Sequence, residues 1–263
     1  MIVQWSSGNA GEGMSEDILT DLAGPVSRHP WFQARARMAV ALLKKVKVLP
    51  PARVLEAGCG WGLNLEALER AGYRAVGLDI ARRSLEKLDR PGRELIEADL
   101  TRPLPPHAEQ YDAVLALDVI EHLDDDRSAV AKLAQLTKPG GFTIVGVPAL
   151  PELFSDFDAV QGHRRRYLPD SLHQAFSGTG LVIEHMLWWG AWMVPLLKRQ
   201  RSRKPDRAAT AETPAAAYKR YLALPPWPAT LLMRAAFSLS QARSLRGESK
   251  TGTSLFALAR RVG

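Results

Sequence analysis

The most constraining stretch of the sequence is a short apolar strand pattern that ends in an acid and runs into three alternating glycines, Val54-Leu55-Glu56-Ala57-Gly58-Cys59-Gly60-Trp61-Gly62. Because glycine has no Cβ, such a turn can adopt positive φ and lets a ligand lie against the backbone. A helical pattern follows, and a helix start offers unpaired N–H groups that suit a carboxylate or phosphate. A dinucleotide-binding loop usually has the spacing G-x-G-x-x-G, whereas position 63 is Leu here. The stretch predicts a ligand-binding turn between a strand and a helix.

Length and composition indicate one large globular domain. The chain has 263 residues, 46% of them hydrophobic, and no run of about 18 apolar residues that would predict a transmembrane helix. Residues 1–21 lack the basic start and apolar centre of a signal peptide. Cys59 is the single cysteine, which excludes an intrachain disulfide or a cysteine metal cluster and favours a reducing compartment. We therefore expect a cytoplasmic protein.

The net charge of +7 is divided unevenly along the chain. Residues 1–163 carry 18 basic and 23 acidic side chains, a net −5, whereas residues 164–263 carry 17 and 5, a net +12. A basic third can meet nucleic acid, an anionic membrane surface or a phosphorylated substrate, although a solvated basic face is commoner. Since the sequence has no RNA-binding or helix-turn-helix signature, we do not expect a nucleic-acid partner.

Strands and helices alternate after an amphipathic helix expected over residues 31–47. The expected strands are 53–56, 75–79, 94–98, 113–117 and 142–147, and the expected helices between them are 63–70, 84–88 and 127–136. This alternation predicts a doubly wound α/β sheet of parallel strands with right-handed crossovers. Ligands of such sheets bind at the carboxyl ends of the strands.

Acids stand at the ends of the first four strands. Glu56 ends the first strand, Asp79 the second, and Asp99 and Asp118 follow the third and fourth. Any one of them could be a helix cap or a turn residue. Four in succession predict a shared ligand site, and Asp79 stands about 20 residues past the glycines, where an acid binds ribose hydroxyls.

These motifs, taken together, resemble the class I S-adenosylmethionine (SAM) methyltransferases over about residues 30–190. The matching segments are Glu-x-Gly-x-Gly-x-Gly in the first strand and turn, Gly77-Leu78-Asp79, Ala98-Asp99, Asp118-Val119-Ile120-Glu121-His122-Leu123 and Lys138-Pro139-Gly140-Gly141. The resemblance implies that the glycines pass under the methionine portion of SAM. It also implies that Asp79 binds the ribose, Asp99 the adenine amino group, Asp118 the methionine end, and that Glu56 orients the loop and the cofactor's amino group. The implied cofactor-binding residues are Glu56, Gly58, Gly60, Gly62, Asp79, Ile80, Asp99, Leu100, Asp118 and Arg35.

Two further segments resemble a narrower methyltransferase branch associated with glycan or polyprenyl-linked pathways. The first is His29-Pro30-Trp31-Phe32-Gln33-Ala34-Arg35, close to a His-Trp-Trp-Phe-x-x-Arg helix but with Pro30 in place of an aromatic. The second comprises Phe154-Ser155-Asp156-Phe157-Asp158 and Gly162-His163-Arg164-Arg165-Arg166-Tyr167. This resemblance implies a hydroxylated, glycan-linked or lipid-linked acceptor without identifying one.

Methyl transfer from a sulfonium is an in-line displacement, so the protein mainly aligns donor and acceptor and excludes water. A base is needed only for a hydroxyl or a protonated amine. His163 is the first candidate base, His122 the second, and Tyr167 completes the catalytic candidates. Alternatively, His163 is a turn residue bonded to Asp158, and His122 supports the cofactor loop. We expect no metal ligand.

The arginine run 164–166 is either a solvated patch or a grip for an acceptor phosphate or carboxylate. We assign Arg165, Arg166 and Trp31 to the acceptor site. Trp31, Phe32 and Arg35 could form a lid over the cofactor, although aromatic pairs on an amphipathic helix are more often core.

The last third predicts a helix over 169–177, a sixth strand over 181–188 and a seventh over 253–260, the last antiparallel to the sixth by resemblance to the class I fold. Residues 189–250 then form an insertion with an apolar run to residue 197, a basic run over 198–204 and helices over 215–222 and 229–240. The apolar and basic runs favour a lid or dimer face over a membrane-contacting surface.

The sequence thus predicts one domain with a seven-stranded, mostly parallel sheet and an antiparallel last strand. Its parts are N-terminal cap helices (1–50), a nucleotide-binding core (51–188), the helical insertion (189–250) and the last strand (251–263). The predicted activity is SAM-dependent methyl transfer to oxygen or nitrogen of a small or lipid- or glycan-linked acceptor by a monomer or homodimer. A nicotinamide-dependent oxidoreductase, an RNA methyltransferase and a non-catalytic scaffold are the alternatives.

Overall fold

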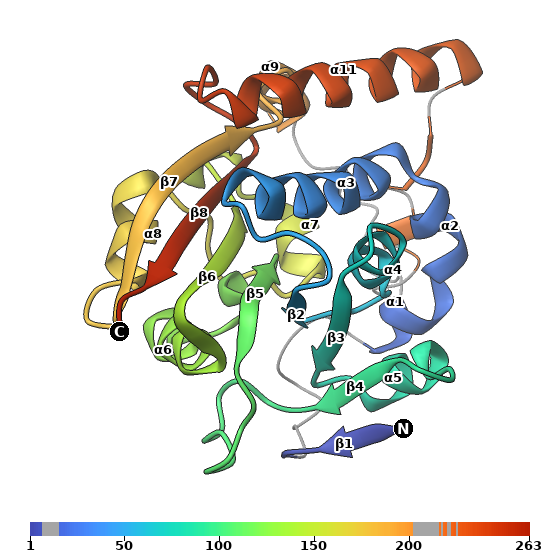
Figure 1. The fold of residues 1–263 in the computed structure, drawn as a ribbon. Helices are drawn as coiled ribbons and strands as arrows, with labels where there is room; N and C mark the ends of the chain where they lie inside the picture. Colours follow the sequence, from blue (N-terminus) through green and yellow to red (C-terminus); the bar gives the residue numbers. More distant parts are fainter. Residues whose placement is uncertain (7–15, 202–215, 217, 220–221, 225) are drawn as a thin grey trace.

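The computed structural model describes residues 1–6, 16–201, 216, 218–219, 222–224 and 226–263, and it shows a sheet covered by helices on both faces (Figure 1). The strand order is β1-β4-β3-β2-β5-β6-β8-β7. The strands are β1 (Ile2–Gln4), β2 (Arg53–Ala57), β3 (Arg74–Asp79), β4 (Glu94–Glu97), β5 (Tyr111–Leu117), β6 (Thr137–Pro148), β7 (Leu181–Trp189) and β8 (Ser254–Arg261).

Alternating side chains of the central strands separate the two helical layers. Val54 and Leu115 point into the cluster formed with α3 and α4, whereas Leu55 and Val114 point into the cluster with α6 and α8. This is the alternation that a sheet buried on both faces requires. The helices on the first face are α3 (Pro30–Lys45), α4 (Leu63–Arg70), α5 (Arg82–Leu88) and α11 (Trp227–Leu245), and those on the second are α6 (Asp126–Leu136) and α8 (Pro169–Ala175).

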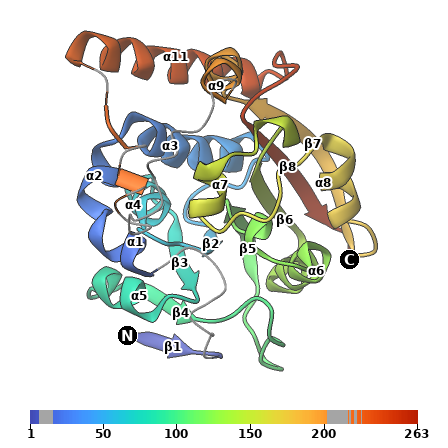
Figure 2. The same ribbon diagram turned by 180° about the vertical axis from the view of Figure 1, so that it is seen from behind.

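Short helices join these layers around the carboxyl ends of the strands (Figure 2). They are α1 (Glu16–Asp21), α2 (Ala23–Arg28), the 3-10 turns η1 (Ile120–His122) and η2 (Pro151–Leu153), α7 (Asp156–Val160) and α9 (Met193–Arg201). None of the described helices combines the length and hydropathy needed to cross a bilayer.

The sheet has eight strands rather than the seven predicted. The additional strand is β1, which pairs in parallel with β4 at the edge of the sheet. A three-residue strand is too short to show periodicity in the sequence, so β1 is identified only by its pairing with β4 in the structure. The antiparallel pairing of the last strand is confirmed, because β8 runs antiparallel to both β6 and β7.

The insertion contains more regular structure than its sequence indicated. The expected helix 229–240 extends over the 19 residues of α11, and α9 begins inside the apolar run. Most of the expected helix 215–222, and the basic residues beyond 201, lie outside the described residues. In both views α11 is the outermost helix, beyond α3 and far from β1 (Figures 1 and 2).

Candidate functional site

The glycine turn between β2 and α4 has the backbone conformation that the sequence predicted. Gly58, Gly60 and Gly62 have φ of 74°, 45° and 73°. A Cβ on Gly58 would lie 2.4 Å from a methyl group of Val119, so the turn and the loop after β5 approach too closely for any side chain. Gly62 is the N-cap of α4. A Cβ there would lie 2.6 Å from the side chain of Leu88, so Gly62 faces the contact between α4 and α5.

Asp79, at the end of β3, fixes this turn. One carboxylate oxygen accepts from the backbone N–H of Gly60 at 2.7 Å, and the other accepts from that of Ala81 at 2.9 Å. The hydroxyl of Ser84 donates to the carbonyl of Gly60 at 2.5 Å, which holds the same loop from α5. Asp79 therefore sets the shape of the glycine turn while its carboxylate lines the cavity described below.

Asp99 is held in a similar way after β4. Its Oδ1 accepts from both the backbone N–H and the hydroxyl of Thr101, each at 2.7 Å. Its own N–H donates to the hydroxyl of Ser6, which follows β1, at 2.9 Å. The short edge strand thus contributes directly to the position of a strand-end acid.

Asp118 forms an ion pair with a buried cation. Arg35 Nη2, from α3, lies 2.5 Å from Asp118 Oδ2, and the guanidinium carbon lies 5.3 Å from the ring centres of both Trp31 and Phe256. Asp118 has φ of 60°, a strained value for a residue with a Cβ. Burial raises the pKa of Asp118, and the charge of Arg35 opposes this rise.

Glu56 lies next to this ion pair and is also buried. Its Oε1 accepts from the side-chain amide of Asn64 at 2.5 Å. Burial raises the pKa of Glu56 to about 8, although the hydrogen bond from Asn64 works against the shift. Glu56 Oε2 and Arg35 Nη1 have no hydrogen-bond partner among the described residues. Glu56 and Arg35 therefore each present a buried polar atom that a ligand can bind.

These strand ends surround one cavity of about 1100 Å³. The predicted site residues that line it are Arg35, Trp31, Glu56, Gly58, Gly60, Asp79, Ile80, Asp99, Leu100, Asp118, His122, His163 and Arg166. Its remaining wall includes Trp192 and Met193 at the start of α9, and Met233 and Phe237 on α11. The cavity thus joins the polar strand ends to an apolar compartment under the insertion.

His163 is oriented by a buried carboxylate on one side of this cavity. Its Nδ1 lies 3.1 Å from Asp158 Oδ1, and the same carboxylate accepts from Arg166 Nε at 2.7 Å and from the hydroxyl of Ser155 at 3.0 Å. Burial alone would raise the pKa of Asp158, but the hydrogen bond from His163 and the charge of Arg166 lower it to about 2. Since the ionised carboxylate only accepts, His163 Nδ1 is the donor of this hydrogen bond, while Nε2 lies 3.8 Å from Glu121 Oε1.

His122 packs edge-on against His163, with the ring centres 4.8 Å apart. Burial and the neighbouring His163 lower the pKa of His122 to about 4. Glu121, fully buried beside them, has its pKa raised by burial and by Asp118. Glu121, His122 and His163 each bring one ligand atom within 4.8 Å of the others, a spacing at which they could share a metal ion.

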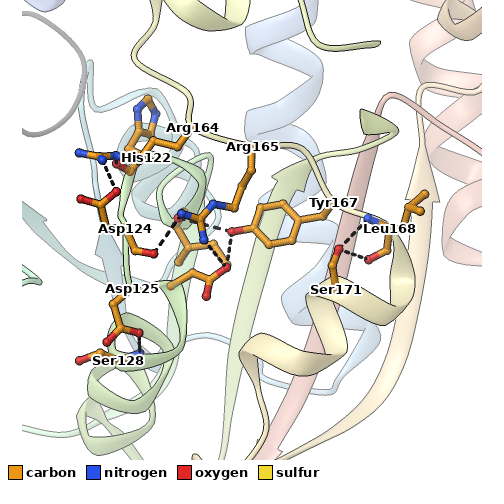
Figure 3. A network of polar contacts seen from close by, with 11 residues as sticks. His122, Asp124, Asp125, Ser128, Arg164, Arg165, Tyr167, Leu168 and Ser171 are labelled. Carbon is orange, nitrogen blue, oxygen red and sulfur yellow. Dashed lines mark hydrogen bonds and ion pairs between the residues drawn. The ribbon is translucent and has the colours of Figure 1, made fainter. Parts of the chain in front are cut away.

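Three predicted site residues, Gly62, Arg165 and Tyr167, are not part of the cavity wall, and the last two join a separate polar network (Figure 3). The Tyr167 hydroxyl donates to Asp126 Oδ2 at 2.8 Å, and Arg165 Nη1 donates to the same oxygen at 3.2 Å. Arg164 also turns away, donating to the carbonyl of His122 at 2.6 Å. Of the segment 164–167, Arg166 lines the cavity, whereas Arg164, Arg165 and Tyr167 do not.

The sequence did not single out the aromatic wall formed by Trp192 and Phe237. The only available signal was the apolar run of the insertion, which does not reveal which side chains face the site. Asn64 was also missed, because a single amide on a helix has no pattern. Asp158 was expected only as a partner for His163, and it also binds Arg166 and Ser155.

The glycine turn, the strand-end acids and an antiparallel β8 between β6 and β7 define a class I SAM-dependent methyltransferase fold. A family model described as "Methyltransferase domain" matches residues 28–186, so the chain belongs to this family. A ubiquinone biosynthesis O-methyltransferase from Bordetella avium is 38% identical over 96 residues, which are 34% of this chain and 40% of that protein. The match therefore spans about two fifths of that curated relative.

Solved structures show the same fold at low identity. The [4+2]-cyclase SpnF is 19% identical with a TM-score of 0.59, covering 98% of this chain and 100% of that one. A Haemonchus contortus phosphoethanolamine N-methyltransferase, in complex with S-adenosylhomocysteine, is 17% identical with a TM-score of 0.51, covering 86% of this chain and 53% of that one. Identities this low establish the fold alone.

Proposed function

We propose that this protein transfers the methyl group of SAM to an oxygen or nitrogen of a small acceptor. The observation that carries the proposal is the convergence of Asp79, Asp99 and Asp118 on one cavity that also contains an oriented histidine. When bound, SAM would supply a methyl group on a sulfonium, which is transferred by in-line displacement.

The buried unpartnered atoms fit the amino-acid end of this cofactor. Glu56 Oε2 would accept from an ammonium group once the carboxyl group is ionised, and Arg35 Nη1 would donate to a carboxylate. Asp79, at the end of β3, would bind the ribose hydroxyls, and Asp99 would accept from the adenine amino group. Gly58 and Gly60 let the ligand lie against the backbone of the turn.

His163 would act as the base toward a hydroxyl acceptor. Asp158 accepts from Nδ1, so in the neutral ring Nε2 would be the nitrogen that takes the proton of the acceptor. The low pKa of His122, about 4, makes that imidazole a weaker base at neutral pH. We therefore assign His122 to support of the cofactor loop. Arg166 holds Asp158 through its guanidinium and positions the pair, rather than binding the acceptor.

The acceptor would carry an apolar part. Trp31, Trp192 and Phe237 face the cavity and offer ring surfaces to such a group. The curated relatives are named O-methyltransferases, which supports oxygen as the accepting atom. A lipid- or glycan-linked hydroxyl is the finer form of this proposal. The cytoplasmic location and the monomeric or homodimeric state remain predictions.

Thermal unfolding with S-adenosylhomocysteine tests cofactor binding. Ligand at about 100 times its Kd should stabilise the native state by roughly 2.7 kcal/mol, a rise in Tm of about 5–10 °C. Asp79→Ala should remove this rise, whereas Asp170→Ala, at an exposed position on α8, should keep it. Because Asp79 also holds the glycine turn, the Tm of each variant without ligand is measured first. No rise for the wild type, or an equal rise with NAD, would contradict the proposal.

His163→Ala tests the base. With a hydroxyl acceptor found by screening, turnover should fall by about 10²–10⁴-fold and lose its dependence on pH near neutrality, while S-adenosylhomocysteine affinity is retained. Asp158→Asn, which removes the ionised partner of Nδ1, should shift the pH profile without abolishing turnover. If the His163→Ala enzyme kept the wild-type rate and profile, His163 would be only a structural turn residue.

A further inference from the structure

The outward face of α11 is apolar. Trp227 is 74% exposed, Leu232 73% and Leu239 61%, and Leu231 and Ala235 are exposed between them. These positions recur on one side of the helix, opposite Phe237, which is buried. A helix that simply covers a domain has a polar outer face, so an apolar one indicates a contact that the described chain does not make.

The charged residues within the two helices of this surface are all of one sign. Arg234 and Arg243 are the only charged residues in the sequence of α11, and both are exposed. The neighbouring α9 contributes exposed Lys198 and Arg199 beside Leu196, which is 58% exposed. Neither helix contains Asp or Glu. Lys198 pairs with Glu152 at 3.3 Å and Arg243 with Glu248 at 3.9 Å, so the outer surface of the insertion combines large apolar side chains with a net excess of positive charge.

The position of α11 leaves this surface accessible. The helix packs on α3 and β7 through its inner side and is the outermost element in both views (Figures 1 and 2). The same inner side carries Met233 and Phe237 into the cavity wall. One helix thus has two apolar faces, one toward the cavity and one toward the outside.

We propose that the outer faces of α9 and α11 bind an anionic lipid surface. Trp and Leu side chains enter the boundary between headgroups and acyl chains, and flanking Arg and Lys side chains reach the lipid phosphates. Charge favours this occupant over a second copy of the chain. A twofold interface through this face would bring its arginines and lysines together, and Glu152 and Glu248, the acids paired with two of them, are too few to offset the cations, which costs free energy.

Vesicle flotation with the full chain tests this proposal. The wild type should bind vesicles of phosphatidylcholine with phosphatidylglycerol and bind pure phosphatidylcholine far less, and salt should weaken the binding. A Trp227→Gln/Leu232→Gln variant should lower the partition coefficient at least about tenfold, because each change removes a large inserted side chain. Leu49→Gln/Val182→Gln, at exposed apolar positions far from α11 in sequence, should bind like the wild type.

A second variant separates loss of binding from loss of folding. Arg234→Gln/Arg243→Gln leaves every apolar side chain in place and should reduce only the preference for anionic vesicles. The Tm of each variant is measured alongside. Lack of binding to anionic vesicles, or equal binding by the wild type and the Trp227→Gln/Leu232→Gln variant, would overturn the proposal. A wild-type dimer in analytical ultracentrifugation that the same variant dissociates would assign the face to self-association instead.

Discussion

Glu56 should leave a direct signature in the pH dependence of stability. Burial raises its pKa from 4.5 to about 8 in the folded protein. In the unfolded chain the pKa returns toward 4.5, so between these values the folded state holds one more proton than the unfolded state. The contribution of Glu56 to stability is thus fully present below about pH 4.5 and is lost as pH rises through about 8.

The magnitude follows from the linkage relation. A difference of one bound proton changes the free energy of unfolding by about 1.4 kcal/mol for each pH unit. Glu56→Gln keeps the side-chain size and can still accept from Asn64, but it does not titrate. From about pH 5.5 to 7.5 the wild type should therefore lose about 3 kcal/mol relative to the variant.

Urea unfolding followed by circular dichroism, repeated at half-unit intervals of pH, measures this difference. The wild type and Glu56→Gln curves should diverge steadily over the interval. Glu86→Gln, at an exposed position on α5, should run parallel to the wild type. If the difference between the wild type and Glu56→Gln were independent of pH, Glu56 would be ionised in the folded protein and the inferred role of its burial would be wrong.

Two other substitutions, with Gly92→Ala as a control, probe the glycine turn and the hydrogen bond of Tyr167. Gly58→Ala should lower the free energy of unfolding by about 1–3 kcal/mol and weaken S-adenosylhomocysteine binding, because the new Cβ would lie 2.4 Å from Val119. Gly92→Ala, with φ of 82° and no atom within 4 Å of the new Cβ, should cost only about 1 kcal/mol and leave binding intact in calorimetry. Tyr167→Phe should remove the hydrogen bond to Asp126 and cost about 1 kcal/mol in urea unfolding, with unchanged turnover. A loss of turnover there would restore a catalytic role.

The core of the fold was readable from the sequence because its signals are local. The strands before Asp79 and Asp118 are continuous apolar segments, and the expected helix 63–70 coincides with α4. The acids at the strand ends then follow from the parallel arrangement, which brings those ends together. Nothing beyond periodicity and residue type was needed to place them around one cavity.

The parts that the sequence left undetermined depend on contacts between distant segments. Whether Arg165 or Arg166 faces the cavity depends on how the segment before α8 packs, and no local pattern reveals it. Similarly, residues 2–4 form the strand β1 only because they pair with β4 at the edge of the sheet. The sequence of α11 is apolar on both sides of the helix. Only its packing on α3 shows which side faces the domain and which faces outward.

The position of β8 restricts the order in which the molecule can assemble. Among the described strands, β7 pairs with β8 alone, and β8 also pairs with β6. β7 precedes the insertion and β8 follows it, so β7 cannot join the sheet until the chain has passed through α9 and α11. That contact closes a long loop, and long loops are slow to close. Completion of the sheet and the position of the aromatic wall of the cavity therefore depend on the same segment between β7 and β8.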